Sequence, residues 1–599
     1  MRIELINEPN PSLSTVDQIL INRGIPKSCV KSYTHLTDDV ICDFETLGMD
    51  KITAALDLLK EAINNSLDCA VIVDSDCDGF ASAALLINYL YDLAPTWAAQ
   101  HINWFMHSGK QHGLNDQMDN LMPNGCCKYQ LVFVPDGGSN DFDAHYTLKT
   151  AGCNVIVLDH HLADKVSEDA IIINNQLSDY PNKEACGACI TWQFCRAIDK
   201  IYNRDYSDKY IDIVALALCG DMMSLKSWET RRLITKGFEK KNIKNPFIDY
   251  MLDKNSFPLS KPDYVSSNPR MACTSMGAAF FIVPFVNAIT RTGTMEEKDL
   301  IFKSMLNHYA FNKIPEIKRN KKTGKEEYLV LQAVRVIGNV KNRQTREEQK
   351  GVENLESKIQ EYNMLDHGAL FFKLKQNEIN SGVRGLVANK LMSKYMRPCI
   401  ITTESNETLD GSMRGYTKNG LDDFKSLLQT CPGVNFVQGH HNAAGISIQK
   451  SQLHDFLVEL DARMADYPPD PTYKVDYIFE YYYFNHINTI NPTRILDIAG
   501  LNDLWGQDIE RAHIGIKCQV LGKNITLMKS NTIKIQLPNT SMIMFGATDE
   551  QVQELFSAPD GWLEIKAYCK CNTNEWNGNL SAQLIIEDYE ITSISKYIF

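Results

Sequence analysis

Aspartates alternate along one short stretch of the chain. Asp74, Asp76 and Asp78 stand directly after the apolar run 70–73. Carboxylates repel one another at this density unless a cation lies between them, and Mg²⁺ and Mn²⁺ prefer oxygen ligands. The position that would close a Ca²⁺ loop counted from Asp74 is Leu85, which is not an acidic ligand. The stretch therefore predicts a divalent metal site, with a solvated acidic loop as the alternative.

Comparable motifs follow other apolar segments. They are Asp136 after residues 131–134, Asp159 with His160 and His161 after residues 155–158, and Asp221 after an apolar helix over 213–219. Imidazole ligands favour Mn²⁺ over Mg²⁺, and a second histidine can stay unliganded as an acid or a positioning group. Because open α/β sheets bind ligands at the carboxyl ends of their strands, we expect these motifs to converge. Two ions there could hold a phosphodiester, activate water and stabilise the departing oxygen.

The hydrophobic pattern predicts the elements that position these motifs. Short apolar runs, typical of strands buried on both faces, occur at 70–73, 131–134 and 155–158. Helical patterns lie around them at 14–66, 81–91 and 211–218. Strands that alternate with helices predict a parallel α/β sheet.

After residue 236 the pattern changes. Residues 237–370 are mostly helical in pattern, and the charged stretch 318–322 within them indicates a solvated loop. A second α/β unit spans 369–448, and the Pro- and Asp-rich stretch 466–471 is typical of a linker. Short alternating segments from 474 onward predict a small β-barrel.

Composition sets broader limits. The 599 residues are enough for several domains, and an apolar fraction of 44% with 23% charged residues excludes a disordered or low-complexity chain. The net charge of −13 argues against a protein that coats nucleic acid through bulk charge. It is compatible with a nuclease, because bound cations and a local basic groove can reverse the field at the site.

Cysteine and hydropathy patterns indicate a cytoplasmic protein. The chain has 17 cysteines but only one Cys-x-x-Cys pair, at 186–189, so reduced thiols are expected and a zinc knuckle is not. The start of the chain lacks the pattern of a secretory signal. The uncharged stretch 271–290 contains Pro284 and Asn287, which favours a buried helix over a membrane span.

The combined motifs resemble the DHH phosphoesterase superfamily, and within it the RecJ-type single-strand-specific exonucleases. The four metal-site motifs described above match the superfamily pattern. Further segments similar to the RecJ type are 20–25, 112–114, 180–188 and the helical connection with Asn287 and Arg291. Lys110 stands where the family usually has Arg. The resemblance covers nearly the whole chain.

The second α/β unit resembles the DHH-associated domain. The segments 411–414 and 439–445 match its signatures, in which small residues let the backbone approach a phosphate while Arg414 and His440 could bind it. Asn380 and Gln438 depart from the family pattern, which indicates a divergent member and leaves a viral origin open. The last region, with Trp576, resembles the oligonucleotide-binding (OB) domain of long RecJ proteins.

The resemblance implies an α/β fold: a parallel-sheet DHH domain, a smaller α/β DHH-associated domain and a C-terminal OB-like β-barrel. The expected divisions are a helical segment at 1–66, the DHH domain at 67–236, a helical connection at 237–368, the DHH-associated domain at 369–465 and the OB-like domain at 474–599. One DNA strand would thread between the two α/β lobes.

The resemblance also implies a 5′-to-3′ exonuclease that hydrolyses single-stranded DNA to mononucleotides. The implied metal ligands, for two Mn²⁺ ions with Mg²⁺ as the other option, are Asp74, Asp76, Asp136, His160 and Asp221. The implied catalytic partners are Asp78, Asp159 and His161, and the implied substrate-binding residues are Arg291, Ser412, Arg414, His440 and Trp576. Two interpretations of Trp576 stay open: it stacks on bases, or it is a core or turn residue.

Several alternatives stay open at this point. One is a phosphodiesterase that cleaves short oligonucleotides or cyclic dinucleotides, and another is a non-catalytic replication scaffold. The scaffold requires degraded metal ligands, whereas every motif carboxylate is present. Besides DNA, the partners considered are a single-strand-binding protein or a helicase, with no membrane.

Overall fold

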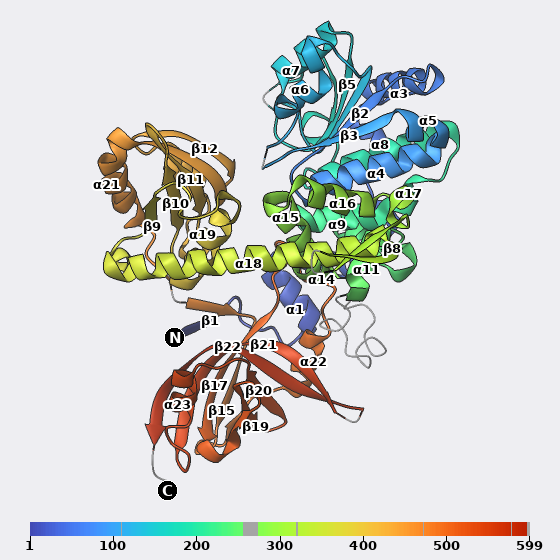
Figure 1. Ribbon diagram of the computed structural model, residues 1–599. Coiled ribbons are helices and arrows are strands. Elements are labelled where there is room, and N and C mark those ends of the chain that lie inside the picture. Colours follow the sequence, from blue (N-terminus) through green and yellow to red (C-terminus); the bar gives the residue numbers. More distant parts are fainter. Residues whose placement is uncertain are drawn as a thin grey trace. The chain divides into compact units, whose positions relative to one another are not determined.

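The structure, a computed structural model, describes residues 1–109, 111–163, 165–254, 274–318, 321–470, 472–576 and 578–595 (Figure 1). The chain forms two compact units. The first contains Met1–Thr290, Thr294–Arg335 and Thr472–Phe599, and the second contains Arg291–Gly293 and Val336–Pro471.

The first unit contains the predicted parallel sheet. Its strand order is β3-β2-β4-β5-β6, and all neighbours are parallel. The strands are β2 (Cys69–Val73), β3 (Ile102–Met106), β4 (Leu131–Pro135), β5 (Asn154–Asp159) and β6 (Ile171–Asn174). The three predicted runs are the three central strands, which are buried on both faces. The edge strands β3 and β6 were not predicted, because β3 is partly exposed and β6 has only four residues.

Buried helices pack around this sheet. The longer ones are α3 (Met49–Asn64), α4 (Cys77–Leu93), α7 (Phe142–Thr150), α8 (Gly187–Tyr202), α9 (Ile211–Gly220) and α10 (Trp228–Gly237). Shorter ones are α1 (Thr15–Asn22), α2 (Val30–Thr34), α5 (Pro95–His101), α6 (Met118–Leu121) and α11 (Pro246–Lys254). Helix α4 is buried from Cys77 to Tyr91, as expected for a helix that is apolar on every face. It contacts both α8 and α9.

The segment 1–66, predicted to be helical, begins with a strand. β1 (Arg2–Leu5) pairs in parallel with β14 (Thr472–Val475), which lies more than 460 residues away in the sequence. A nearby ion pair fixes the same region, since Arg23 donates through both Nη atoms to the buried Asp476 carboxylate at 2.8 and 2.9 Å. The four residues of β1 alternate polar and apolar side chains, but a run this short carries too little local signal to predict a strand.

A buried carboxylate ties α10 to distant segments. Glu229 accepts hydrogen bonds from the Cys42 backbone N–H (2.8 Å), the Tyr180 hydroxyl (2.7 Å) and the Asn182 amide (2.8 Å). We expect Glu229→Ala to lower the free energy of unfolding by about 3 kcal/mol, because three donors lose this acceptor and the Tyr180 and Asn182 side chains are buried. Urea unfolding measures this change. The exposed Glu45→Ala should change it by less than about 0.5 kcal/mol, and equal effects of the two variants would contradict the assignment.

The uncharged stretch 271–290 forms two short helices where it is described, α14 (Ser275–Phe281) and α15 (Val283–Thr292). Residues 271–273 lie outside the described residues. Within the part of the chain that the structure describes, no helix combines the length and the apolar character needed to cross a bilayer.

The charged stretch 318–322 is not a loop throughout, so that prediction was wrong. Lys318 ends β7 (Lys313–Lys318) and Lys321 begins β8 (Lys321–Tyr328), and the two strands form an antiparallel hairpin. Helices α16 (Met295–Met305) and α17 (Asn307–Ala310) precede the hairpin, and the 33-residue α18 (Leu329–Glu361) follows it. The hairpin lacks the apolar/polar alternation typical of a half-buried strand, because most of its side chains are exposed on both faces.

The second unit is a smaller α/β fold, as predicted. Its mixed sheet has the order β12-β13-β11-β10-β9. The strands are β9 (Leu370–Leu374), β10 (Cys399–Glu404), β11 (Thr408–Arg414), β12 (Val434–His440) and β13 (Ala443–Gln449), with helices α19 (Ser381–Tyr395), α20 (Phe424–Gln429) and α21 (Leu453–Met464). Two buried apolar clusters form its core, one of which includes Leu355 and Ile359 of α18.

The C-terminal region forms a mixed eight-stranded sheet. Its order is β16-β15-β17-β21-β22-β20-β19-β18. The strands are β15 (Tyr477–Tyr482), β16 (Ile487–Asn488), β17 (His513–Leu521), β18 (Ile525–Met528), β19 (Thr532–Leu537), β20 (Thr540–Met544), β21 (Trp562–Trp576) and β22 (Asn579–Ser595), with helices α22 (Pro492–Ala499) and α23 (Asp549–Leu555). Among the described residues the end strands β16 and β18 do not pair with each other, so the OB-like barrel stays a prediction.

Candidate active site

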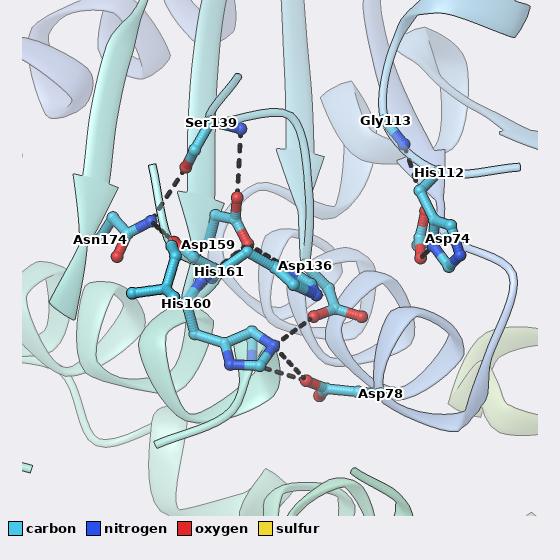
Figure 2. Close-up of polar contacts among 12 residues, drawn as sticks. Asp74, Asp78, His112, Gly113, Asp136, Ser139, Asp159, His160, His161 and Asn174 are labelled. Atoms are coloured by element: carbon cyan, nitrogen blue, oxygen red, sulfur yellow. Dashed lines mark hydrogen bonds and ion pairs between the residues drawn. The ribbon is translucent and has the colours of Figure 1, made fainter. Parts of the chain in front are cut away.

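Acidic residues gather at the carboxyl edge of the parallel sheet, as the sequence predicts. Asp74 directly follows β2, Asp136 directly follows β4, and Asp159 is the last residue of β5 (Figure 2). Asp221 joins them from the end of α9, since its carboxylate lies 3.5 Å from His160 Nε2. All four belong to the first unit, in which parallel strands bring their carboxyl ends to one edge.

The turn from β2 into α4 is unusually tight. Asp76 caps α4 by accepting the Gly79 N–H at 3.0 Å. A Cβ on Gly79 would lie 2.4 Å from the Asp74 Cβ and 2.8 Å from its backbone carbonyl carbon. Glycine is therefore required at position 79, because only a residue without a Cβ lets α4 begin this close to Asp74.

Asp136 has a strained backbone. Its φ is +65°, a left-handed conformation that costs energy for residues other than glycine. The Asp136 N–H donates to the Leu158 carbonyl at 2.8 Å, which holds it beside β5. On its other side Gly187 packs against it so closely that a Cβ there would lie 2.7 Å from the Asp136 Cα. This surrounding structure keeps the carboxylate pointing into the site.

Three buried polar atoms converge without hydrogen bonds. His160 Nε2 lies 3.2 Å from Asp136 Oδ1 and 3.5 Å from Asp221 Oδ2, and among the described residues none of these atoms has a hydrogen-bond partner. Figure 2 shows the His160 ring turned toward Asp136 and Asp78. Buried polar atoms are almost always satisfied. An imidazole nitrogen and two carboxylate oxygens with no other partner fit a divalent cation such as Mn²⁺.

Electrostatics support the same interpretation. Burial, reinforced by the neighbouring carboxylates, raises the pKa of Asp136 and of Asp221 well above the ordinary range. Burial also lowers the pKa of His160, which keeps its imidazole neutral and able to bind a metal. A bound cation would stabilise the charged carboxylates that the protein alone disfavours.

The ligand atoms form overlapping groups. Within 4.8 Å of one another lie one set of Asp74, Asp76 and Asp136, a second of Asp78, His160 and Asp221, and a third of Asp136 with Asp159, His160 and His161. Asp136 and His160 each belong to two sets. This overlap fits two adjacent ions that share ligands.

The two histidines of the motif lie in different environments. His161 Nδ1 is 2.8 Å from Asp159 Oδ1, and its side chain is 53% exposed, whereas that of His160 is 9% exposed. Burial lowers the pKa of His161, but the hydrogen bond to Asp159 outweighs it and raises the pKa to about 9. Burial by itself would raise the pKa of Asp159. The hydrogen bonds from His161 and from the Ser139 N–H outweigh burial and bring this pKa below the ordinary range. His161 is thus a protonated group held at the rim of the site.

Asp78, predicted as a catalytic partner, has a clear positioning contact. Its carboxylate accepts the backbone N–H groups of Gly187 (2.6 Å) and Ala188 (2.9 Å) at the start of α8. An anion is stabilised at a helix N-terminus. Asp78 therefore fixes α8, and with it Gly187, against Asp136, while its Oδ2 also lies 3.8 Å from His160 Nε2.

Two further histidines join the site that were not among the predicted site residues, although His112 begins the segment 112–114 that resembles the RecJ type. His112 Nδ1 contacts Asp74 Oδ2 at 2.5 Å. His107 directly follows β3, and its buried Nε2 lies 3.9 Å from Asp74 Oδ1 with no hydrogen-bond partner among the described residues. Burial lowers the pKa of His107 to about 4. The sequence contains a signal for His107, because this residue directly follows a segment that ends in apolar residues, as the other motifs do. It was missed because β3 itself was not predicted.

The predicted phosphate-binding residues lie in the second unit. Ser412 and Arg414 lie on the same face of β11, because they are two residues apart in the strand. His440 is the exposed last residue of β12, which pairs with β13. The Arg414 guanidinium packs on α19, where a Cβ on Gly385 would lie 2.5 Å from its Nη2. Burial and the charge of Arg291 lower the pKa of Arg414, which places two cations near each other in this unit.

The predicted base-stacking residue of the C-terminal region lies on β21. Trp576 ends β21, but its side chain lies outside the described residues. Tyr568 of the same strand already stacks on His513, with ring centroids 4.5 Å apart. That ring face is therefore not open to a base.

Comparisons with known proteins agree with this geometry. Residues 68–218 match the family model described as the DHH family, N-terminal domain, and residues 367–466 match the DHHA1 domain. The chain is 30% identical over 606 residues to YorK of Bacillus subtilis (strain 168), an SPbeta prophage-derived protein assigned as a single-strand DNA-specific exonuclease. That alignment covers 99% of this chain and 98% of YorK.

More distant relatives share the architecture. The single-stranded-DNA-specific exonuclease RecJ of Bacillus subtilis (strain 168) is 23% identical over 96% of this chain and 68% of its own. The crystal structure of RecJ in complex with Mn²⁺ from Thermus thermophilus has a TM-score of 0.70 at 16% identity, covering 98% of this chain and 79% of RecJ. The resemblance noted from the motifs is confirmed: this chain belongs to the RecJ-like family of DHH nucleases.

Proposed function

We propose that this protein is a metal-dependent exonuclease that hydrolyses single-stranded DNA to mononucleotides in the 5′-to-3′ direction. The observation that carries the proposal is the set of three buried, unpartnered ligand atoms on His160, Asp136 and Asp221. The single-strand-specific exonucleases to which the chain is similar support the substrate. The direction is inferred from the family resemblance.

We assign two divalent ions, Mn²⁺ by preference, to the ligand set Asp74, Asp76, Asp136, His160 and Asp221. Bound ions of this kind polarise a phosphoryl oxygen and lower the pKa of a coordinated water. The chain's own residues would orient the scissile phosphate at the sheet edge, with Asp136 central because it belongs to two ligand groups. RecJ structures solved with Mn²⁺ and with Mg²⁺ support the choice of cation.

His161 is the candidate acid that protonates the departing oxygen. Its Nδ1 is engaged by Asp159, which leaves Nε2 to donate a proton at the rim of the site. Asp159 would act through His161 by fixing the ring and stabilising its charge. Asp78 would act by positioning α8 and Asp136.

We assign substrate-phosphate binding to Arg291, Ser412, Arg414 and His440, and base stacking to Trp576. Charge-assisted hydrogen bonds from arginine suit a phosphodiester, and the proximity of Arg291 to Arg414 supports the grouping. The domain division that we propose is a segment at 1–66, the DHH domain at 67–236, a connection at 237–368, the DHH-associated domain at 369–465 and the C-terminal domain at 474–599.

A time course on 3′-labelled single-stranded DNA with Mn²⁺ tests the proposal. The expected result is a ladder that shortens from the 5′ end, is absent on a duplex of the same sequence and is lost in Asp136→Ala. A ladder that begins at the 3′ end would overturn the direction. An inert strand would overturn the exonuclease, and hydrolysis of a dinucleotide alone would assign the activity to short substrates.

A further inference from the structure

The hairpin of β7 and β8 concentrates positive charge on an acidic protein. The strands β7 and β8 hold five lysines against three glutamates, whereas the whole chain carries a net charge of −13. The lysines of both strands are exposed. A local basic surface on a protein of the opposite net charge is complementary to a polyanion.

Most of these lysines lack a carboxylate partner. Two of the hairpin's three glutamates are already engaged, because Glu316 pairs with Lys318 and Glu327 pairs with Arg335. The exposed Glu326 is in none of the ion pairs of the described residues. No ion pair among the described residues involves the other four lysines, which are Lys313, Lys321, Lys322 and Lys325. Lys318 and Lys321 stand directly opposite each other in the strand register. Like charges directly opposite each other are destabilising, and Glu316 offsets only the charge of Lys318.

The hairpin is held against α18 along its length. Arg335 of α18 binds the Glu327 carboxylate through both Nη atoms and donates to the Ile317 carbonyl at 3.3 Å. The Ile317 N–H donates to Gln332 of the same helix at 3.2 Å. Isolated two-stranded hairpins are marginally stable, so these contacts preorganise the lysines and reduce the entropy lost on binding.

Two aromatic rings lie exposed at the open end of the hairpin, where Lys313 pairs with Tyr328. Phe311 is 49% exposed and Tyr328 is 42% exposed, and their ring centroids are 5.7 Å apart in an edge-to-face arrangement. Large apolar side chains exposed together beside a cluster of lysines are typical of surfaces where bases stack and phosphates are neutralised.

We propose that this hairpin, defined as residues 313–318 and 321–328, forms with the adjacent Phe311 an accessory binding surface for single-stranded nucleic acid. The lysines would bind the phosphodiester backbone, and Phe311 with Tyr328 would stack against bases. The choice of DNA as the ligand rests on the proposed function. The surface is separate from the metal-site residues, so its contribution is measured as affinity and not as chemistry.

Equilibrium binding to a labelled 30-nucleotide poly(dT), at several salt concentrations, tests the surface. The chain used carries Asp136→Asn so that the DNA stays intact, which is checked on a gel. Replacing Lys313, Lys321, Lys322 and Lys325 with Gln should reduce the slope of log K against log salt by about 3, since each phosphate contact on a single strand contributes about 0.7. Replacing the exposed lysines 27, 31, 60 and 200 of the same unit is the matched control and should leave the slope unchanged.

The aromatic part has its own test. Phe311→Leu with Tyr328→Leu keeps apolar packing and removes stacking, so affinity should fall about fivefold or more while the salt slope is unchanged. An unchanged salt slope in the lysine variant, or an equal change of slope in the control, would overturn the proposal. A loss of affinity that is measured only with duplex DNA would also overturn it. Because this assay measures binding and not hydrolysis, the two proposals can fail separately. A wild-type protein that binds poly(dT) through the hairpin but does not cleave DNA would contradict the proposed function and leave this inference standing.

Discussion

Replacing Asp136 with Asn should abolish hydrolysis while leaving the fold intact. The carboxylate is buried, and its Oδ1 lies 3.2 Å from His160 Nε2 with no hydrogen-bond partner among the described residues. Asn keeps the shape and tolerates the positive φ but loses the charge that holds a cation. We expect the rate to fall by about 10³-fold or more, which corresponds to about 4 kcal/mol of lost transition-state stabilisation.

Thermal unfolding separates this effect from misfolding. Burial beside other carboxylates disfavours the charged form of Asp136, so the Asn variant should be as stable as the wild type or more stable without added metal. Mn²⁺ should raise the Tm of the wild type and raise that of the variant much less, because ligand binding stabilises only the state that binds it. Asp143→Asn, at an exposed position of α7, is the matched control. A variant that retains both hydrolysis and the Mn²⁺ shift would exclude Asp136 from the metal site.

Adding one methyl group at Gly187 should disable the site from outside the ligand set. A Cβ there would lie 2.5 Å from Asp136 Oδ1 and 2.7 Å from the Asp136 Cα. Backbone must move to accommodate it, and the movement also disturbs the hydrogen bond from the Gly187 N–H to Asp78. We expect Gly187→Ala to lower the free energy of unfolding by about 1–3 kcal/mol. Activity should fall by about 10²-fold, as displacements near 1 Å do at positioned sites.

A second glycine supplies the comparison. At Gly500 a Cβ would lie 3.4 Å from the nearest atom, the Asp497 carbonyl oxygen, which is an ordinary contact, and φ is −77°. Gly500→Ala should therefore change stability by less than about 1 kcal/mol and leave hydrolysis unchanged. The two variants are measured by urea unfolding and by the rate on single-stranded DNA. If Gly187→Ala behaved like Gly500→Ala, the close packing against Asp136 would have no part in the site.

The sequence by itself determined the parallel α/β sheet and the motifs at its edge. Uninterrupted apolar runs identify strands buried on both faces, and a carboxylate directly after such a run must lie at the carboxyl end of that strand. Asp74, Asp136 and Asp159 were located in this way. Weak local signals explain the omissions, since β1, β3 and β6 are short or partly exposed.

Only the tertiary structure decided what each polar residue contacts. His160 and His161 are neighbours in the chain, yet one is buried among carboxylates and the other is bonded to Asp159 at the rim. Asp78 binds the start of α8, 109 residues away, and His107 reaches Asp74 through a strand that the pattern did not reveal. Side-chain roles depend on burial, distance and long-range partners, which no local pattern encodes. The order of residues sets which groups reach the sheet edge, and packing sets what each can do there.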